Sequence, residues 1–285
     1  MVYPKIMRVH RINSRAKINL NLNVIGKSKL KKLHIIESLV CFVNLYDKIY
    51  ISKLKSNSHR VIFTGKFSKN ITKENTITNL LSMLDKNNVL KNKYKILIKK
   101  EIPLQSGMGG GSMNAANLLN FFYKNKFINF KELKKYASKI GSDVILGFNS
   151  KPKILYRDGS VKEVTNIKKY HILIVKPSFG CSTKKIYSAN KTFSRFEFNK
   201  TKKHIVKNVV LNGKNDLEKS AFKLYPALKK IKNLLVQNKQ ASFVRMTGSG
   251  SAIIMYFSSN KFAKNALKIY KRKLNNCLCI ITKIV

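Results

Sequence analysis

The sequence predicts an α+β fold. Its first half opens with segments of strand length whose hydrophobicity alternates with a period of two, and amphipathic helical patterns follow them. Its second half mixes short apolar segments of strand length with further helical patterns. The chain has 285 residues, of which 44% are hydrophobic, so it can bury a substantial core. This length suits one large domain or two smaller ones that share a cleft.

The predicted elements of the first half begin with a strand over residues 17–25. Here Ile18, Leu20, Leu22 and Val24 alternate with Asn19, Asn21 and Asn23, which predicts one buried and one polar face. Strands are also predicted at 35–43 and 48–54, joined at 44–47, and at 60–67 beside them. A helix is predicted at 75–84 and a strand at 95–99. The next helix carries Ala115, Leu118, Leu119 and Phe122 on its buried side. This half ends with a helix at 130–140 and a hairpin of 153–156 with 161–164.

The second half contains predicted strands at 171–175, 252–257 and 277–284. Helices are predicted at 183–188, 216–225, 226–237 and 261–274. Residues 192–212 are basic and polar and are predicted to form a loop or insertion. No internal repeat is present, and the weakest compositional boundary lies near residues 157–168.

The charge is extreme, with 58 Lys and Arg against 12 Asp and Glu, a formal net charge of +46. Nucleic acid and an anionic membrane are the obvious partners for such a chain. The excess is mostly Lys, however, and it is spread along the whole chain together with abundant Asn and Ile. All three residues have A/T-rich codons, so genome composition is a sufficient cause. We therefore expect neither partner, although a polyanionic substrate would benefit from the positive field.

Other compositional features favour a cytoplasmic protein. No apolar run reaches the roughly 18 residues that a membrane helix needs, and the first residues lack the apolar segment of a signal peptide. The four cysteines form no zinc-binding pattern, so reduced structural thiols are expected. The five histidines form no metal-ligand pattern either.

The strongest local signal is a glycine-rich loop over residues 105–111 that opens directly into a helix. Glycines let backbone N–H groups approach a ligand closely, and the helix start adds unpaired N–H donors and a partial positive charge. This combination fits the pyrophosphate of a nucleotide, although a flexible turn is the alternative. A P-loop is excluded because Asn21 stands where its first glycine would be, before Gly26-Lys27-Ser28. The dinucleotide-binding fingerprint is excluded because its last glycine is replaced by Ser112.

Three further segments could carry chemistry. Lys17 and Asn19 share the polar face of the first predicted strand. Asp143, one of only five aspartates, lies in a short polar turn after a helix. Residues 245–252 form a loop of small residues that leads into a strand. Taken singly, each has an ordinary alternative: a solvated lysine, a turn-forming aspartate and a tight turn.

Together these four segments resemble the motifs of a small-molecule kinase superfamily, that of galactokinase, homoserine kinase, mevalonate kinase and phosphomevalonate kinase. Within it the chain is most similar to the 4-diphosphocytidyl-2-C-methyl-D-erythritol kinase family. The resemblance is carried by residues 16–20, 103–116, 141–144 and 245–250, and it covers nearly the full length. It implies a two-domain kinase fold with a ribosomal-protein-like N-terminal domain (residues 1–162), a ferredoxin-like C-terminal domain (residues 163–285) and a cleft between them.

The resemblance also implies roles for individual residues. Asp143 would take the proton of the substrate hydroxyl, and Lys17 would keep that carboxylate ionised and stabilise the transferring phosphoryl group. ATP would be bound by Pro103, Leu104, Gln105, Ser106, Gly107, Met108, Gly109, Gly110, Gly111, Ser112 and Met113. Mg²⁺ would arrive with ATP. Ser112 is a candidate contact for it, but no second carboxylate is apparent, so its protein ligands stay open and no metal-binding residue is assigned. Substrate would be bound by Asn19, His34, Thr183, Tyr187, Gly248 and Ser249, with His34 and Tyr187 stacking on the cytosine base.

Some positions depart from the family pattern. Lys32-Leu33-His34 stands where the family usually has Gly-Tyr-His, which removes one expected aromatic contact with the substrate. Met108 replaces a commoner Leu, and Gln105-Ser106 replaces part of a glycine run. The first change puts substrate affinity, rather than the identity of the reaction, in doubt.

The resulting prediction is an ATP-dependent kinase of a small alcohol, acting as a monomer or homodimer. A sister kinase of homoserine or mevalonate is one alternative, against which His34 and Tyr187 argue because those alcohols offer no base to stack on. A nucleic-acid-binding protein on the same scaffold is another, supported only by the charge. A decayed enzyme is a third, and the intact Lys17 and Asp143 argue against it.

Overall fold

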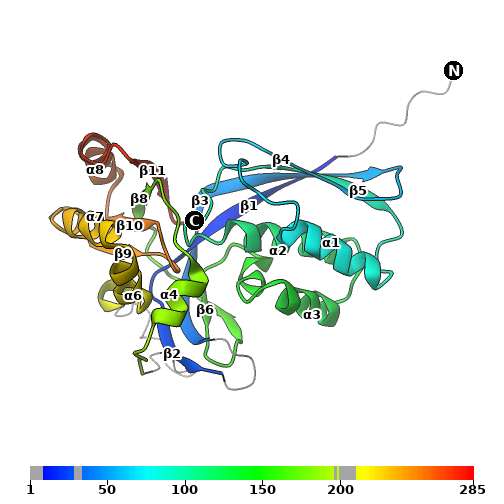
Figure 1. Ribbon diagram of the computed structural model, residues 1–285, viewed down its shortest axis with the longest axis horizontal. Coiled ribbons are helices and arrows are strands. Elements are labelled where there is room, and N and C mark those ends of the chain that lie inside the picture. The colour runs from blue at the N-terminus through cyan, green and yellow to red at the C-terminus, as the bar shows by residue number, and fades with distance from the viewer. Residues whose placement is uncertain (1–8, 29–33, 196–197, 199–209) are drawn as a thin grey trace. The chain divides into compact units, whose positions relative to one another are not determined.

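The computed structural model of the chain describes residues 9–28, 34–195, 198 and 210–285 (Figure 1). Contacts divide it into two compact units. Unit 1 falls within residues 1–16, 45–103 and 110–149, and unit 2 within residues 17–44, 104–109 and 150–285. The units interleave along the sequence because β1 (His10–Asn19) and β3 (His34–Leu54) contribute residues to both. They therefore provide no test of the division into residues 1–162 and 163–285, which stays a prediction.

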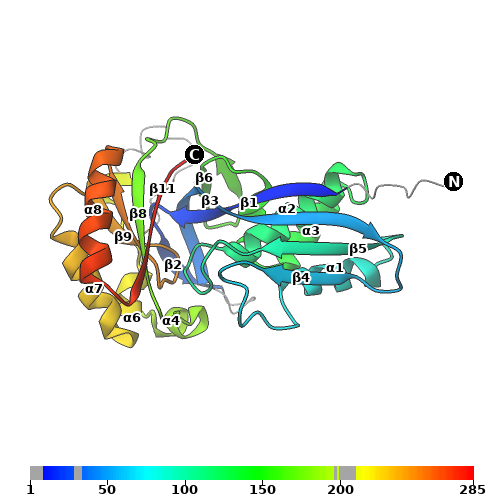
Figure 2. The same cartoon turned by 90° about the horizontal axis from the view of Figure 1, so that it is seen from above.

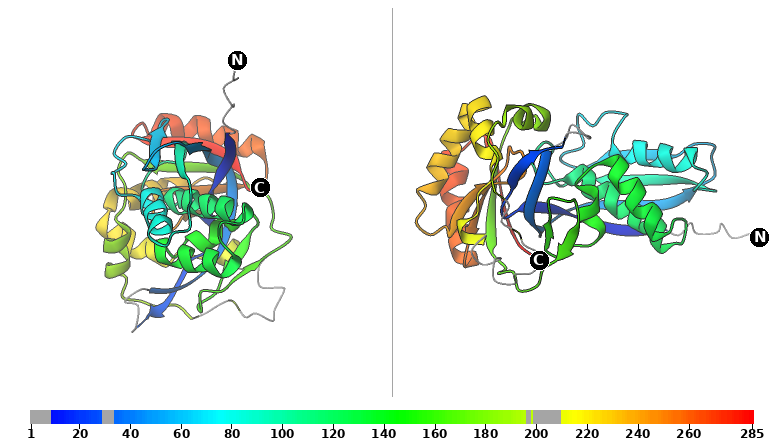
Figure 3. Two further views of the ribbon diagram at one scale, coloured as in Figure 1. Left: turned by 90° about the vertical axis from the view of Figure 1, so that its right-hand side faces the viewer. Right: turned by 90° about the horizontal axis from the view of Figure 1, so that it is seen from below.

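Unit 1 is a sheet covered on one face by helices. The C-terminal half of β3 pairs antiparallel with β5 (Lys93–Lys99), which pairs parallel with β4 (Arg60–Thr64). The covering helices are α1 (Thr76–Lys86), α2 (Gly110–Lys124) and α3 (Phe130–Ile140), and a short 3-10 helix, η1 (Val144–Phe148), follows them. Figures 1 and 3 show these helices together on one side of the strands. The α+β class predicted from the sequence is confirmed.

Helices α1 and α3 begin where the sequence supplies a capping side chain. The Asn75 side chain accepts hydrogen bonds from the backbone of Ile77 and Thr78, and that of Asn129 accepts one from Glu132. The apolar stripes predicted for α1 and α2 are buried in one core: Ile77, Leu80, Leu81, Leu84, Ala115, Leu118, Leu119 and Phe122. Helical spacing in the sequence is thus sufficient to build this layer.

Unit 2 contains two groups of paired strands. The N-terminal half of β3 pairs antiparallel with β2 (Asn23–Lys27) and β6 (Lys153–Leu155), and β6 forms a hairpin with β7 (Val161–Glu163). A second, wholly antiparallel sheet has the order β11 (Cys277–Lys283), β8 (His171–Pro177), β10 (Ile253–Phe257) and β9 (Phe243–Met246). The helices of this unit are α4 (Thr183–Ala189), α6 (Leu217–Leu224), α7 (Pro226–Val236) and α8 (Asn260–Lys273), of which α6, α7 and α8 cover one face of this sheet (Figure 2).

The prediction of a continuous strand over residues 17–25 is wrong. The chain forms β1, leaves it at Leu20 and re-enters the sheet as β2 at Asn23. The predicted polar face is also wrong, because Asn19, Asn21 and Asn23 are only 3%, 0% and 0% exposed. Asn21, for example, accepts a hydrogen bond from the backbone of Leu39 (2.6 Å). Buried amides that bind backbone groups produce the same alternation as solvated ones.

Two other predictions differ from the structure, and two elements were not predicted. Residues 44–47 do not join two strands, because β3 runs through them without a break. The strand β4 ends at Thr64 and pairs with β5 rather than with β3. Neither β9 nor η1 was expected from the sequence, because both are short and neither has a distinctive period. The predicted loop over residues 192–212 lies largely outside the described residues.

A buried carboxylate closes the base of the glycine-rich loop in unit 1. Asp47 Oδ1 accepts hydrogen bonds from the backbone N–H of Glu101 (2.8 Å) and Ile102 (2.9 Å), just before the loop. Asp47 Oδ2 accepts one from Asn114 Nδ2 (2.8 Å), in α2 just after the loop, and is paired with the Lys100 ammonium. Asp47 is 0% and Lys100 3% exposed. One side chain therefore fixes where the loop starts and where it ends.

No helix among the described residues is long and apolar enough to cross a membrane.

Replacing Asp47 by Asn should destabilise the protein strongly. The amide would leave the Lys100 ammonium buried without its counter-charge, a change that typically costs about 3–5 kcal/mol. Urea denaturation should report this as a lower free energy of unfolding. The matched control is Glu101→Gln, which removes the exposed Lys99–Glu101 pair (3.4 Å) and should cost less than about 1 kcal/mol. Equal effects of the two substitutions would show that the Asp47 network does not stabilise the loop base.

Candidate active site

Unit 2 joins the two glycine-rich loops of the sequence. The backbone N–H of Ser251 donates to the carbonyl of Gln105 (3.1 Å), and that of Ala252 donates to the carbonyl of Ser106 (3.3 Å). Residues 104–109 and 247–252 are therefore paired along their backbones, although about 140 residues separate them in the sequence.

Glycine is required where these two loops touch. A Cβ atom on Gly107 would lie 2.0 Å from the carbonyl oxygen of Thr247, and one on Gly248 would lie 2.7 Å from the carbonyl oxygen of Gly107. Both residues also have positive φ angles, +74° and +53°, which other residues rarely adopt. Any side chain at either position would separate the loops.

The side chain of Asn19 links β1 to the second loop. Its Oδ1 accepts hydrogen bonds from the Gly248 backbone N–H (3.0 Å) and the Thr247 hydroxyl (3.3 Å). Its Nδ2 donates to Ser38 Oγ (2.7 Å), and its backbone N–H donates to Thr247 Oγ1 (3.0 Å). An amide side chain is needed here because it must accept and donate at the same time.

Lys17 is held between Asn19 and the first loop. Its Nζ donates to Asn19 Oδ1 (2.8 Å), and its backbone N–H donates to the carbonyl of Met108 (3.1 Å). Its aliphatic chain lies against Gly109, where an added Cβ would be 3.0 Å from Lys17 Cγ. With only 3% of its surface exposed, Lys17 is not the solvated lysine of the alternative interpretation. A fixed ammonium group beside a glycine-rich loop can stabilise negative charge on phosphate oxygens.

Two of the predicted substrate-binding residues meet at the second loop. Thr183 Oγ1 and Ser249 Oγ are 2.8 Å apart, and Thr183 begins α4, which the Ser182 side chain caps. Gly180, just before this helix, lies so close to Gln105 that an added Cβ would be 1.9 Å from Oε1.

The nearby Cys181 is buried, which raises the pKa of its thiol to about 11. The thiol is therefore protonated at neutral pH and is no candidate nucleophile.

The predicted aromatic pair is in direct contact. The rings of His34 and Tyr187 have centroids 5.0 Å apart and planes tilted by 42°. Burial, and the Lys27 ammonium in addition, lowers the pKa of the His34 imidazole, which favours a neutral ring. A cytosine base between the two rings would have to replace this contact. Leu33, where the resemblance expects tyrosine, lies outside the described residues, as does Lys32.

In unit 1, the remaining part of the predicted ATP loop forms the start of α2. Gly110, Gly111 and Ser112 make up its first turn, which contains no acidic side chain. The Thr76 hydroxyl donates to the carbonyl of Gly111 (3.2 Å), and Met113 is fully buried. Pro103 is buried immediately before the segment that belongs to unit 2. The first amide groups of a helix have no partner within the helix, so anion binding by this turn stays a prediction.

Asp143 lies at the start of η1, also in unit 1. Its backbone carbonyl accepts a hydrogen bond from Leu146 (3.1 Å), and its side chain is partly exposed. The short helix packs directly on α2, because a Cβ on Gly147 would be only 2.6 Å from the Cβ of Ala116. This close approach fixes the Asp143 segment against α2, the helix that follows the first glycine-rich loop.

The sequence interpretation missed several residues that hold the predicted site together. They include Ser38, Asp47, Asn215 and the hydroxyl of Thr247. Asp47 could have been found, since only five aspartates occur in so basic a chain and each must have a specific reason to be there. Ser38 and Asn215 carry no comparable signal. Among the described residues, no group of three or more His, Cys, Asp or Glu side chains could hold a metal ion.

Comparison with known proteins agrees with this geometry. Residues 75–152 match the N-terminal domain of the GHMP kinases, and residues 203–276 match their C-terminal domain. The chain is 50% identical over 283 residues to a 4-diphosphocytidyl-2-C-methyl-D-erythritol kinase of Pelagibacter ubique, covering 98% of this chain and 100% of the relative. It is 30% identical over 275 residues to the kinase of the same name from Anaplasma marginale, covering 93% and 94% of the two chains.

Solved structures show the same fold. A crystal structure of 4-(cytidine 5'-diphospho)-2C-methyl-D-erythritol kinase aligns with a TM-score of 0.77 at 22% identity, covering 96% of this chain and 99% of the other. Homoserine kinase from Cytophaga hutchinsonii aligns with a TM-score of 0.66 at 14% identity, covering 100% and 97%. By its identity to curated relatives over nearly its whole length, the chain belongs to the 4-diphosphocytidyl-2-C-methyl-D-erythritol kinase family of GHMP kinases.

Proposed function

We propose that this protein transfers the γ-phosphate of ATP to the 2-hydroxyl of 4-diphosphocytidyl-2-C-methyl-D-erythritol, a step of the non-mevalonate route to isoprenoid precursors. The observation that carries the proposal is the junction in unit 2, where Lys17, Asn19 and the two glycine-rich loops are joined by hydrogen bonds. At this junction the Lys17 ammonium lies beside a glycine-rich backbone that a phosphate group could approach closely. Phosphoryl transfer depends on such positioning and on such stabilisation of charge. The Pelagibacter and Anaplasma relatives carry this substrate in their names.

Two side chains would take part directly in the reaction. Lys17 would stabilise the negative charge on the oxygens of the transferring phosphoryl group. Asp143 would orient the substrate hydroxyl and accept its proton as the oxygen attacks the γ-phosphorus. The bond from that phosphorus to the oxygen shared with the β-phosphate would break, ADP would leave, and the Asp143 carboxyl group would then release the proton to solvent. The backbone of residues 103–113 would bind the remaining phosphates, with the first turn of α2 adding a partial positive charge. These roles rest on the family resemblance together with the local geometry.

Mg²⁺ would accompany ATP. This ion usually keeps several waters and binds through substrate phosphates and one or two protein oxygens, so it does not need a cage of protein ligands. When bound, the ion would neutralise charge on the phosphates. Ser112, in the first turn of α2, is the protein oxygen that the sequence offers for it.

The cytidyl group would be recognised by the His34 and Tyr187 rings, and the rest of the substrate by Asn19, Thr183, Gly248 and Ser249. The neutral state favoured for His34 suits an apolar stacking surface. The observed contact between the two rings means that substrate binding would rearrange this pair.

The setting of the reaction would be the cytoplasm. All four cysteines are free, as expected in a reducing compartment. The protein would act as a monomer or homodimer, without nucleic acid or membrane as a partner.

Turnover of ATP by the purified protein should depend on 4-diphosphocytidyl-2-C-methyl-D-erythritol, and Asp143→Asn should lower kcat about 10²–10⁴-fold, the usual contribution of a general base. The measurement is ADP release with and without the alcohol. Asp158→Asn is the matched control, because this aspartate lies in an exposed turn, where it accepts hydrogen bonds from Ser160. A folded protein that shows no alcohol-dependent turnover would overturn the proposed function. Normal turnover by Asp143→Asn would instead remove only the role of that residue.

The substitution His34→Ala should raise the KM for the cytidyl substrate. Loss of one stacking partner costs about 1–3 kcal/mol per base, or about five- to hundredfold in affinity. The KM for ATP in the same variant is the internal control and should not change. An unaltered KM for the cytidyl substrate would exclude His34 from base recognition and leave the reaction itself untouched.

A further inference from the structure

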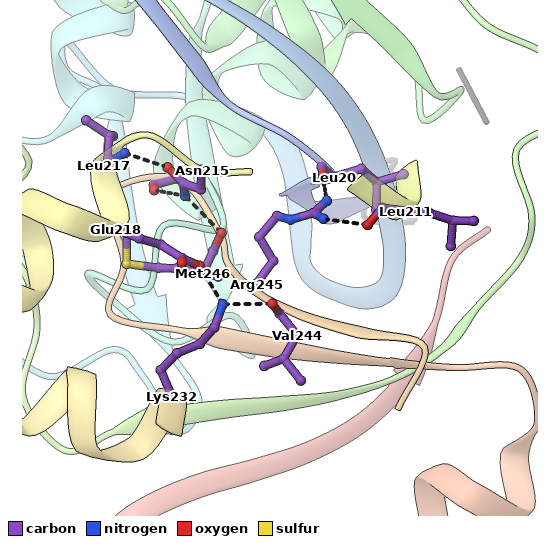
Figure 4. Close-up of polar contacts among 10 residues, drawn as sticks. Leu20, Leu211, Asn215, Leu217, Glu218, Lys232, Val244, Arg245 and Met246 are labelled. Atoms are coloured by element: carbon purple, nitrogen blue, oxygen red, sulfur yellow. Dashed lines mark hydrogen bonds and ion pairs between the residues drawn. The ribbon is translucent and has the colours of Figure 1, made fainter. Parts of the chain in front are cut away.

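Residues at the start of α6 bind the backbone of Met246 and Gly248. Figure 4 shows Asn215, Leu217 and Glu218 beside Met246. Asn215 is buried, with 4% of its surface exposed, and its Nδ2 donates to two carbonyl oxygens, those of Met246 (2.9 Å) and Gly248 (2.8 Å). Its Oδ1 accepts a hydrogen bond from the backbone N–H of Leu217 (3.0 Å), at the first turn of α6. The Asn215 side chain is thus bound to α6 through its oxygen. Its two amide hydrogens bind carbonyl oxygens of β9 and of the second glycine-rich loop.

The strand before this loop has anchors of its own. Glu218 Oε1 accepts hydrogen bonds from the backbone N–H of Met246 (2.7 Å) and from Lys232 Nζ (2.9 Å), and Lys232 Nζ also donates to the carbonyl of Val244 (2.7 Å). Arg245 donates to the carbonyl oxygens of Leu20 and Leu211. Figure 4 shows these contacts grouped around β9. The loss of Asn215 would therefore leave β9 in place.

Gly248 is different, because Asn215 binds its carbonyl oxygen while its N–H donates to Asn19. The N–H of Gly248 and the Nζ of Lys17 share one acceptor, Asn19 Oδ1. A shift of Gly248 would therefore move or weaken the group that orients the Lys17 ammonium. Glycine offers no side chain with which to resist such a shift, and its positive φ angle must be maintained by its neighbours.

We infer that Asn215 is a positioning residue for phosphoryl transfer, acting through Gly248 and Asn19 on Lys17. The inference rests on the proposed function, because it concerns how Lys17 is oriented for that reaction. Asparagine is specified at this position because two donors must point at two carbonyl oxygens while one acceptor caps the helix. Aspartate of the same size keeps the acceptor but would face both carbonyl oxygens with negative charge.

The test compares Asn215→Asp and Asn215→Ala with Ser259→Ala. The control removes the N-cap of α8, which accepts a hydrogen bond from Phe262 and lies outside the proposed site, and it should cost about 1 kcal/mol of stability. Each kcat is measured at saturating substrates and corrected for the folded fraction. A 1 Å displacement of a reacting group can lower the rate about hundredfold. Both Asn215 variants should lower kcat about tenfold, because Asn215 acts on Lys17 only indirectly. Neither KM should change as much as kcat, and Ser259→Ala should keep the kcat of the wild type.

A double-mutant cycle with Lys17→Met separates positioning from general damage. If Asn215 acts through Lys17, adding Asn215→Asp to Lys17→Met should lower kcat further by less than about threefold, so the two effects are not additive. Full additivity, or an Asn215→Asp variant with the kcat of the wild type, would overturn the inference while leaving the proposed function intact. If Lys17→Met itself turns over normally, the proposed role of Lys17 fails and the inference fails with it. Asn215→Ala removes the amide without adding a charge. If Asn215→Asp lowered kcat and Asn215→Ala did not, the loss would come from the added charge, which would contradict positioning by the amide.

Discussion

The side-chain oxygen of Asn19 is the point on which the unit 2 part of the site depends. It accepts hydrogen bonds from the Lys17 ammonium, the Gly248 N–H and the Thr247 hydroxyl, and so connects β1 to a loop 228 residues further along the chain. A single acceptor with three donors leaves each of them little freedom to move independently. The position of the ammonium is therefore tied to the backbone of the second glycine-rich loop, which in turn is paired with the first. Substitution of any one of these residues would therefore change the positions of the others.

The glycine-rich loop of residues 103–113 is also restrained by hydrogen bonds, which limit its conformational freedom at both ends. Asp47 binds the backbone of Glu101 and Ile102 before the loop and the Asn114 side chain of α2 after it. In the middle, Gly107 is held against Thr247 at a distance that excludes any side chain. Glycine thus supplies the conformations that a phosphate-binding backbone needs, and the neighbouring polar groups remove the flexibility that glycine would otherwise introduce.

Local signals in the sequence were enough for most of the fold and for the outline of the site. Apolar stripes identified α1 and α2, the glycine-rich loop identified the start of α2, and ordered motifs identified Lys17 and Asp143 as candidates. What could not be predicted depends on contacts between distant residues. Period-two alternation is identical for an asparagine that faces water and for one that binds Thr247, so Asn19 was expected on a polar face. The roles of Asn215 and Ser38 likewise exist only because the fold brings them to residues that are distant in sequence.

The distribution of the few acidic residues bears on the meaning of the large positive charge. With 12 acids for 58 bases, random pairing would place most acids on the surface among exposed lysines. Several instead hold backbone groups at structural junctions: Asp47 at the loop base, Asp216 on the N–H of Val24 (2.7 Å) and Glu218 on the N–H of Met246. A carboxylate suits these positions, because both of its oxygens accept hydrogen bonds and its charge strengthens them. A bias toward lysine codons would remove acids wherever they are dispensable and leave them where the fold needs them. Asp47, Asp216 and Glu218 follow that pattern.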